Sequence, residues 1–294
     1  MTTLNPPQGA VAASRARRRP FSFYLGWGLL YAVLVVGALL FALPLVWMLS
    51  SSVKPGYQVY AMPPQWIPDT LIWDGYIEPW KKFAMGTFYR NTLILVIANT
   101  VLTLLSSSLV AFAFARMRFR GRNVLFLLVL STLMLPPQVT LIPTYWLFSR
   151  LKLVNTLYPL IIPALFGAPF NIFLLRQYFM TIPLEMDDAA RIDGCGWFAI
   201  YWRIIVPLSA PAMGVVAIFS ATFWWLEFFQ PLIYLNTENN FPLSIGLTLI
   251  NTRNFNNVQA TFAMTTIALI PIIALFFIAQ RRYVQGIVVS GVKG

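Results

Sequence analysis

Long runs of apolar residues alternate with short polar segments along this chain of 294 residues. A helix of about twenty apolar residues is long enough to cross the roughly 30 Å hydrocarbon core of a bilayer. Backbone groups find no water to bond inside lipid, so each long run is predicted to be a helix. The predicted spans are residues 21–49, 87–115, 123–148, 158–179, 208–235 and 258–279. The predicted fold class is therefore an all-α integral membrane protein with about six transmembrane helices.

The third run is interrupted by Pro136, Pro137 and Pro143. Each proline removes a backbone donor and tends to kink a helix. Broken helices are tolerated in membranes where protein or water satisfies the freed carbonyl groups, so a translocation pathway is predicted here. Gln138, beside the break, is a candidate residue of that pathway.

The composition agrees with a membrane protein and excludes several other classes. Hydrophobic residues make up 59% of the chain and charged residues 10%, against about a quarter charged in soluble domains. The net charge of +12 comes from short basic clusters between the apolar runs, which does not favour nucleic-acid binding. The single cysteine, Cys195, excludes an internal disulfide, and the absence of histidine removes the usual zinc ligand. No metal site is expected.

Six spans place both chain ends on one side of the membrane. Of the 21 Lys and Arg residues, fourteen lie in the segments on the side of the chain ends and seven on the other side. Basic residues accumulate in cytoplasmic segments, so both termini are predicted to be cytoplasmic. Residues 1–20 are predicted to be a disordered basic cytoplasmic arm, and residues 21–294 a single transmembrane domain. A cleaved signal peptide fits less well, because its apolar core spans only about 7 to 15 residues.

The loop of residues 50–86, on the predicted outer side, is rich in proline and tryptophan. These residues indicate an ordered cap at the membrane interface. Two interpretations of the loop stay open. It anchors the first two spans as an aromatic belt, or it docks a receptor.

Residues 181–207, between the fourth and fifth spans, are predicted to form two short helices joined by a turn, and we call this segment the elbow. Thr181 is suited to cap the first helix, whose early acidic residues favour the positive end of the helix dipole. Asp187 and Arg191 are four residues apart and are expected to pair. Gly194 supplies the freely turning residue between the helices.

The second helix of the elbow is predicted to carry one apolar face, made of Phe198, Tyr201, Trp202 and Ile205, and to end at Pro207. An amphipathic helix lying on lipid headgroups is the competing interpretation. Such helices are normally rich in lysine and arginine, whereas the first arm of the elbow has more acids than bases.

The elbow resembles the EAA loop of the inner-membrane subunits of bacterial binding-protein-dependent ABC importers. That pattern reads Glu-Ala-Ala, three residues, Gly, and then about nine residues to Ile-x-Leu-Pro. This chain departs from it mildly, with Asp188 for glutamate, Cys195 for alanine and Val206 for leucine. The resemblance implies that the elbow sits in a groove of a cytosolic ATPase subunit. The implied coupling residues are Asp188, Ala189, Ala190, Arg191, Asp193, Gly194 and Pro207.

The C-terminal tail, residues 280–294, resembles that of the maltose-transporter type of permease, the carbohydrate branch of this family. The resemblance implies a sugar or polyol cargo, and it implies that Gly291, Lys293 and Gly294 approach the ATPase. Without it, Arg281 and Arg282 indicate only a cytoplasmic stop signal after the last span.

The resemblance also implies the partners and the location of the chain. The partners are a dimer of ATPase subunits, a second permease subunit expected to be a different chain, an extracytoplasmic solute-binding protein and the carbohydrate itself. The location is the bacterial inner membrane. The chain has no G-x-x-x-x-G-K-[ST] motif, so it is expected to be a transport subunit without enzymatic activity. No cofactor is expected on this chain, since ATP and Mg would bind the partner.

Glu227 is the one acidic residue inside a predicted span. A charge at the bilayer centre costs about 2.5 to 3.5 kcal/mol even on insertion scales, so this side chain should face protein or water. Together with Trp225 and Gln230 it combines aromatic and hydrogen-bonding groups that suit a sugar in the substrate pathway. The alternatives are a hydrogen bond between helices or a place near the outer interface.

Three rival functions remain. A secondary carrier acting without an ATPase would need coupling residues inside its spans, and Glu227 is little material for that. An ABC importer permease for a non-carbohydrate cargo differs only in what it moves. A membrane-embedded enzyme is disfavoured, because the chain has neither histidine nor a G-x-S-x-G motif.

Overall fold

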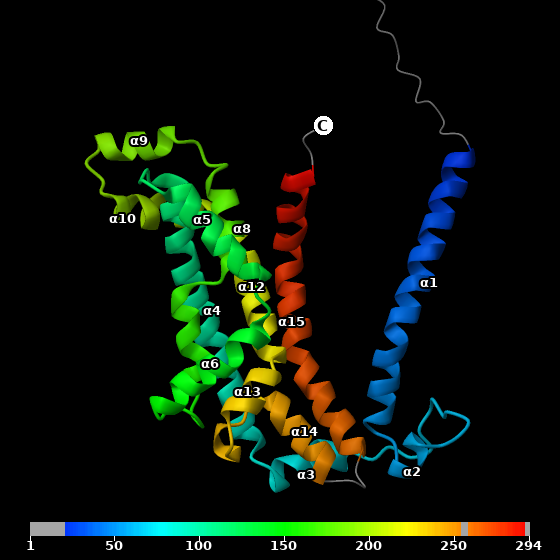
Figure 1. The fold of residues 1–294 in the computed structure, drawn as a ribbon. Coiled ribbons are helices and arrows are strands. Elements are labelled where there is room, and N and C mark those ends of the chain that lie inside the picture. The colour runs from blue at the N-terminus through cyan, green and yellow to red at the C-terminus, as the bar shows by residue number, and fades with distance from the viewer. Residues whose placement is uncertain (1–20, 254–257, 292–294) are drawn as a thin grey trace, which may run out of the picture. The chain divides into compact units, whose positions relative to one another are not determined.

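The structure, a computed structural model, describes residues 21–253 and 258–291, and within these ranges the regular elements are all helices. The chain divides into two compact units, Met1–Met48 and Leu49–Gly294. Figure 1 shows the path of the chain through both units.

The described part of the first unit is a single helix. Helix α1 (Phe21–Ser51) runs through it and ends three residues into the second unit. Its apolar stretch Gly26–Ser51 is long enough to cross a membrane, and large apolar side chains are exposed along it. A helix that is hydrophobic on all sides is typical of a membrane span.

The second unit is built around a bundle of four long elements. Helix α4 (Met85–Arg116) packs against α8 (Pro169–Phe179) and α12 (Ala210–Leu226), and α12 packs against α15 (Val258–Gly291). The largest buried cluster joins these helices to the elbow, with Phe179, Ile200 and Ile205 fully buried. The elbow therefore shares its hydrophobic core with the bundle.

The predicted fourth span is one membrane-length segment, Tyr158–Phe179, that is built from three pieces. Helix α7 (Tyr158–Ile161) and the 3-10 helix η2 (Ile162–Phe166) precede α8. Gly167 separates η2 from α8 with a φ of +79°, a backbone conformation that favours glycine.

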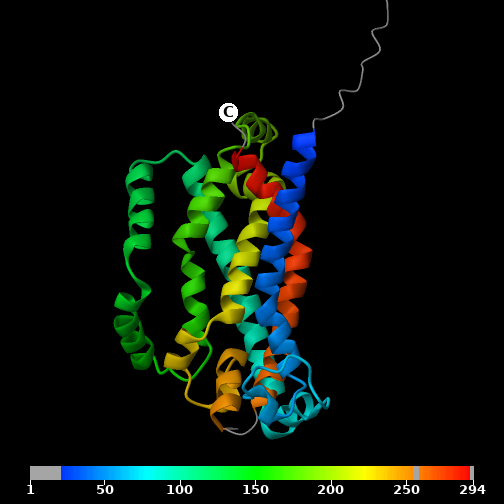
Figure 2. The same ribbon diagram turned by 90° about the vertical axis from the view of Figure 1, so that its right-hand side faces the viewer.

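The predicted third span is broken, as expected from its prolines. It consists of α5 (Arg122–Ser131), η1 (Thr132–Met134) and α6 (Pro137–Arg150), and the two halves are bent by 97°. The break falls at Leu135 and Pro136, whose backbones are extended. The prediction was wrong for Pro143, which lies inside continuous α6. Figure 2 shows these two helices in green at the edge of the bundle, beside α8.

The predicted fifth span, residues 208–235, is not one helix. Helix α12 ends at Leu226, and α13 (Phe229–Tyr234) follows after two residues. The preceding segment Trp197–Leu208 meets α12 at 80°. A short 3-10 helix, η4 (Glu238–Asn240), and α14 (Leu243–Arg253) then lead toward α15. Apolar composition continues through Glu227 and Phe228, but the backbone does not stay helical there, so the sequence run overstates the length of the helix.

The loop of residues 50–86 is folded, in agreement with an ordered cap. It contains α2 (Gly56–Val59) and α3 (Asp74–Lys82). Gln58 is almost fully buried and holds the loop together, since its amide bonds the Gln65 side chain and accepts the backbone N–H of Asp69. Helix α3 packs against α15.

Among the described residues, four elements are long and apolar enough to span a membrane, and counting each of the two bent pairs as one span raises the number to six. The prediction of about six helical spans is thereby confirmed. Helix α15 extends to Gly291, beyond the predicted end of the last span at residue 279, so most of the predicted tail is helical. The predicted basic arm, residues 1–20, and the tail residues Lys293 and Gly294 lie outside the described residues.

Candidate functional site

The elbow lies at one end of the bundle of the second unit, and α3, α13 and α14 lie at the other end (Figure 1). Its first arm is α9 (Glu185–Ile192) and its second arm comprises α10 (Trp197–Ile200), the π-helical turn Tyr201–Ile205 and α11 (Val206–Leu208). Gly194 joins the arms with a φ of +81°, and a Cβ atom there would meet nothing within 4 Å. The turn therefore requires glycine for its backbone and not for lack of space.

The predicted cap of the first arm is wrong. Helix α9 begins at Glu185, and the hydroxyl of Thr181 donates to the carbonyl of Tyr178 at 2.7 Å. Thr181 therefore satisfies a carbonyl at the end of α8 instead of an N–H at the start of α9.

The predicted pair of Asp187 and Arg191 is also replaced by other contacts. The guanidinium of Arg191 lies over the indole ring of Trp197, 4.5 Å from its centroid. This cation–π contact ties the end of the first arm to the start of the second.

Asp187 instead forms a buried ion pair with Arg116, the last residue of α4. The Nε atom of Arg116 lies 3.4 Å from an Oδ atom of Asp187, and the side chains are 1% and 6% exposed. Arg116 also donates to the carbonyl of Ile182 at 2.8 Å. One arginine thus holds both the first arm of the elbow and the segment that leads into it.

Burial and charge act in opposite directions on this carboxyl group. Burial raises the pKa of Asp187, and the guanidinium of Arg116 lowers it by less. The net pKa lies above the ordinary value of 3.8. The negative charge of Asp187 therefore depends on Arg116, because burial without a counter-charge would raise the pKa further.

The second arm is attached to the same helix by a hydrogen bond. The hydroxyl of Tyr201 and the hydroxyl of Ser108 on α4 are 2.7 Å apart, and both residues are at most 1% exposed. The ring of Phe112, one turn further along α4, packs against Tyr201 and Trp197. Both arms are therefore fastened to the last three turns of α4.

The predicted apolar face of the second arm divides into two. Tyr201 and Ile205 are buried, whereas Phe198 is 72% and Trp202 52% exposed. The side chain of Ile200, outside the predicted face, is fully buried. The buried face of the arm therefore runs through Ile200, Tyr201 and Ile205, and it leaves out two of the four residues of the predicted face.

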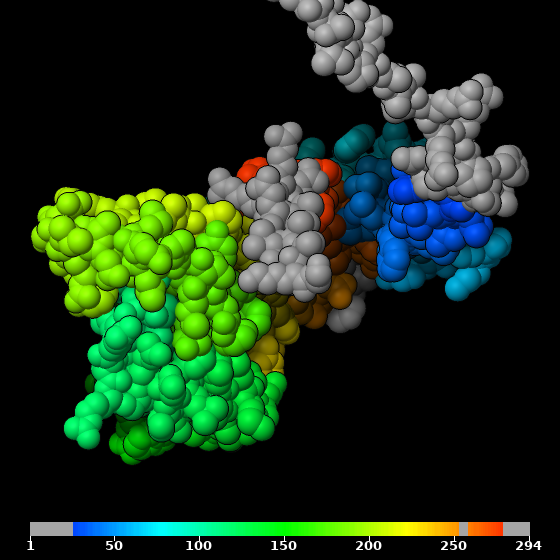
Figure 3. Space-filling model, turned by 90° about the horizontal axis from the view of Figure 1, so that it is seen from above, coloured from blue at the N-terminus to red at the C-terminus, as the bar shows by residue number. Residues whose placement is uncertain are grey.

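The predicted coupling residues are distributed over both surfaces of the elbow. Ala190 is 7% exposed and faces the buried cluster. The other six coupling residues, Asp188, Ala189, Arg191, Asp193, Gly194 and Pro207, are exposed. Ile192 is 87% exposed beside them. Figure 3 looks onto this end of the molecule, where the elbow forms the yellow-green ridge along one side.

The predicted pathway residues are not brought together as a site. Glu227 lies in the break after α12, where its carboxylate accepts the N–H of Gln230 at 2.9 Å and its carbonyl accepts the hydroxyl of Ser244 at 2.7 Å. Trp225 donates to the carbonyl of Ala268 on α15. Gln138 is exposed in the first turn of α6. The carboxylate of Glu227 thus stabilises the start of α13 by a local hydrogen bond, which differs from the predicted alternative of a bond between helices.

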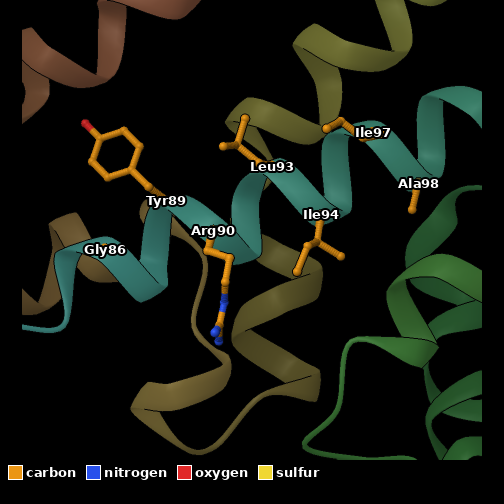
Figure 4. A pocket seen from close by; sticks show the side chains of 7 residues that line it. All are labelled: Gly86, Tyr89, Arg90, Leu93, Ile94, Ile97 and Ala98. Carbon is orange, nitrogen blue, oxygen red and sulfur yellow. The ribbon is translucent and has the colours of Figure 1, made fainter.

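A shallow groove along α4 is a weaker candidate for a binding site (Figure 4). Its volume is about 580 Å³, and all its lining residues come from one face of one helix. Leu93, Ile94 and Ile97 make it apolar, and Arg90 points away from Tyr89 and Leu93. A site that encloses a ligand needs several converging elements, which this groove lacks.

Sequence reasoning missed the residues that hold the elbow in place. Arg116 contributed to the prediction only as one of the basic residues that indicate the cytoplasmic side. Ser108 was one of several hydroxyl-bearing residues in an apolar run. The signal that marked Arg116 was its position, since it directly follows more than thirty residues with one other charge, Arg90.

Comparison with known proteins agrees with this architecture. Residues 104–289, from α4 into α15, match the family described as binding-protein-dependent transport system inner membrane component. The chain is 39% identical over 228 residues to the arabinooligosaccharides transport system permease protein AraQ of Halalkalibacterium halodurans, covering 77% of this chain and 81% of that protein. It is 31% identical to the probable ABC transporter permease protein YurM of Bacillus subtilis, covering 98% and 95% of the two chains.

The fold has also been seen in a solved structure. A chain of a bacterial ABC transporter involved in the import of the acidic polysaccharide alginate superimposes with a TM-score of 0.78 at 24% identity, over 90% of this chain and 98% of that one. The family match covers more than half of the sequence and includes the whole elbow and the end of α4 that anchors it. The chain therefore belongs to the family of inner membrane components of binding-protein-dependent transport systems, and it is a multi-pass permease subunit.

Proposed function

We propose that this permease subunit belongs to an ATP-driven carbohydrate importer and that its elbow transmits the movement of a separate ATPase. The observation that supports this function best is the division of the elbow into two surfaces. Its inner surface is fastened to α4 by the Arg116–Asp187 pair and by the Tyr201–Ser108 hydrogen bond. Its outer surface exposes acidic and apolar side chains, among them Asp188, Ile192 and Phe198.

The outer surface has the chemistry of a protein interface. Ile192 and Phe198 are 87% and 72% exposed, and such large apolar side chains outside lipid are typical of binding surfaces. Asp188 and Asp193 add negative charge, which would complement a basic rim on the ATPase. Ala189 permits close approach of a partner backbone. A dimer of ATPase subunits that binds ATP and Mg is the partner we propose here.

The remaining partners follow from this assignment. A second permease subunit, expected to be a different chain, would complete the pathway, and an extracytoplasmic solute-binding protein would deliver the cargo. The elbow and both termini would face the cytoplasm, in line with the excess of basic residues on that side. The C-terminal residues Gly291, Lys293 and Gly294 would approach the ATPase.

The proposed cargo is a carbohydrate. The tail resembles that of the carbohydrate branch, and the relatives in Halalkalibacterium halodurans and Streptomyces coelicolor are named for arabinooligosaccharides and for diacetylchitobiose. A sugar exposes hydroxyl groups and apolar ring faces, so it suits a pathway with hydrogen-bonding and aromatic side chains.

The test is to purify the chain gently from its native membrane, identify the proteins that accompany it, and measure ATP hydrolysis with candidate sugars and the binding protein. Recovery of an ATPase and a second permease, with hydrolysis stimulated by a sugar-loaded binding protein, is the expected result. A chain that moves solute alone and without ATP would contradict the proposal.

A further inference from the structure

We propose that a cavity between α4, α8 and α12 is a binding subsite for a neutral sugar ring on this permease subunit. The inference rests on the proposed carbohydrate function and makes it specific. None of the residues that sequence reasoning placed in the substrate pathway lines this cavity. Three features of the cavity support the inference. They are polar groups with unused hydrogen-bonding capacity, an aromatic wall and a lining without charge.

Helices α4, α8 and α12 and the 3-10 helix η2 line the cavity, which is partly open and has a volume of about 530 Å³. Asn99 and Thr103 come from the middle of α4, Asn171 from the first turn of α8, and Ser220 from α12. Gly167, at the break before α8, forms part of its edge. Ligand sites in proteins commonly occupy about 300 to 1,000 Å³, so one sugar unit or two would fit.

The polar side chains of the cavity are mostly buried and have hydrogen-bonding capacity that the described residues do not use. Asn99 is fully buried; its amide nitrogen donates to the carbonyl of Leu95, while its amide oxygen has no hydrogen-bond partner. The side chains of Thr103, Asn171 and Ser220 are 7% to 9% exposed and make no hydrogen bond within the described residues. By contrast, the hydroxyl of Ser106, also on α4, bonds to the carbonyls of Leu102 and Ala164.

Four such groups at one place are suited to an external partner. The buried amide oxygen of Asn99 is left unpaired, which costs roughly the value of a lost hydrogen bond in an apolar medium. The two amides and two hydroxyls provide both donors and acceptors from three helices. Sugar hydroxyls, which donate and accept at the same atom, match this mixed set.

Aromatic rings from α8 and α12 form a wall of the cavity beside its polar groups. Phe170 of α8 and Phe219 of α12 have ring centroids 6.5 Å apart, and Phe223 and Trp224 meet edge to face at 5.6 Å. All four rings line the cavity. Flat apolar rings beside hydrogen-bonding groups are the surroundings that the C–H face and the hydroxyl edge of a sugar require.

The lining contains no charged residue. A carboxylate or ammonium group taken from water into this cavity would have no counter-charge, and its desolvation would not be repaid. The cavity therefore selects a neutral ring over a uronic acid, an amino acid or a polyamine. This distinguishes the predicted cargo from the acidic polysaccharide named for the alginate importer of similar fold.

A helix of the second permease is the competing occupant, and cysteine labelling separates it from a sugar. Cys195 is the only cysteine, so Cys195→Ser provides a background without thiols. Ser220→Cys then places one thiol in the cavity, and Asn123→Cys places the matched control at an exposed position outside it. The assembled importer in membranes is labelled with a small methanethiosulfonate, with and without each sugar.

The probes are arabinotriose and diacetylchitobiose as neutral sugars, a trisaccharide of alginate as the acidic one, and any further neutral sugar that the importer transports. A transported neutral sugar is expected to slow labelling of Ser220→Cys about fivefold or more, because a pocket buries most of its ligand's surface. Labelling of Asn123→Cys should not change, and the alginate trisaccharide should not protect. Three outcomes would each overturn the subsite. They are protection by the alginate trisaccharide alone, equal labelling with all sugars, and a thiol that stays unreactive under every condition because a helix covers it.

A second variant gives an independent readout. Asn171→Leu removes two hydrogen-bonding groups and keeps a similar volume, and it is expected to raise the KM for sugar uptake about tenfold. Binding-protein-stimulated ATP hydrolysis should persist, since the elbow is untouched. Uptake with an unchanged KM would contradict the subsite while leaving the importer function intact, whereas an importer that hydrolyses no ATP, or that moves no sugar, would overturn the proposed function itself.

Discussion

The ion pair of Arg116 and Asp187 is the residue-scale contact on which the position of the elbow depends. Both side chains are almost completely buried, so each charge is stabilised by the other instead of by water. The pair joins the end of a membrane helix to the first arm of the elbow. A force on the elbow would therefore reach α4 without passing through the lipid-facing helices.

Arg116→Leu is expected to lower the stability of the solubilised subunit by about 3 to 5 kcal/mol, because it leaves the Asp187 carboxylate buried without its counter-charge. The pKa of Asp187, already raised by burial, then rises further, since the guanidinium was the main group that lowered it. A carboxyl group whose pKa is raised in the folded state stabilises that state at low pH. This stabilisation is lost as the pH rises through the raised pKa. The variant should therefore be more stable near pH 5 than near pH 7.5 in thermal unfolding.

The double variant Arg116→Leu, Asp187→Leu is the matched control. An apolar pair replaces the buried charges without stranding either, so most of the lost stability and its pH dependence should disappear. If the double variant is as unstable as the single one, the ion pair is not what holds the elbow.

Gly194→Val is predicted to uncouple ATP hydrolysis from sugar uptake while the subunit still inserts in the membrane. Gly194 has a φ of +81°, and a β-branched residue is strained in that conformation. Gly196→Val is the control, since Gly196 has a φ of −75° and open space around its Cβ position. Gly194→Asn should retain partial uptake, because asparagine tolerates the left-handed region. Normal uptake by the Gly194→Val importer would contradict the role of the turn.

At the scale of elements, the elbow has one side fixed to α4 and one exposed, free side. Its second arm is held by the bond between Tyr201 and Ser108, two residues separated by 93 positions in the sequence. Its first arm is tied to the second by the contact of Arg191 with Trp197. The elbow and the end of α4 should therefore move together as one body when a partner displaces the free side.

Two neighbouring alanines on α9 test this division. Ala189 is exposed and Ala190 is 7% exposed in the shared core. Ala189→Trp is expected to leave the melting temperature unchanged and to abolish co-purification of the ATPase, since the bulky ring occupies the contact surface. Ala190→Trp is expected to cost about 1 to 3 kcal/mol of stability by overpacking. Retention of the ATPase by the Ala189→Trp subunit would show that the free side is not the contact surface.

At the scale of the whole molecule, the assignment of six spans places the elbow and the loop of residues 50–86 on opposite sides of the membrane. In a Cys195→Ser background, an impermeant maleimide applied to intact cells should label Asp69→Cys and not Asp188→Cys. Both positions are exposed in the structure, so accessibility differs only by side. Labelling of Asp188→Cys from outside, with Asp69→Cys silent, would invert the proposed topology.

The family match also argues against one of the rival functions, the secondary carrier. A secondary carrier was an open alternative, although Glu227 alone was little material for the coupling residues that it needs. The structure places that carboxylate on a backbone N–H at the start of α13, and the chain belongs to a family of binding-protein-dependent transport components. The presence of an acidic residue at position 227, inside an apolar run, is accordingly explained by its local hydrogen bond.

The sequence alone determined the features that depend on neighbouring residues. Span number follows from the length of the apolar runs, the bend of the third span from Pro136 and Pro137, and the turn of the elbow from the freedom of Gly194. These are local properties, since helix length, missing donors and backbone dihedral angles are set within a few residues.

Only the tertiary structure decided which side chains meet across the chain. The partner of Asp187 is Arg116 and not the adjacent turn's Arg191, the partner of Tyr201 is Ser108, and the polar groups of Asn99 and Asn171 converge on one cavity. Several arginines and hydroxyls along the sequence were equally suited to these contacts. Packing selected among them, because burial makes the energy of each contact depend on surroundings that are distant in the sequence.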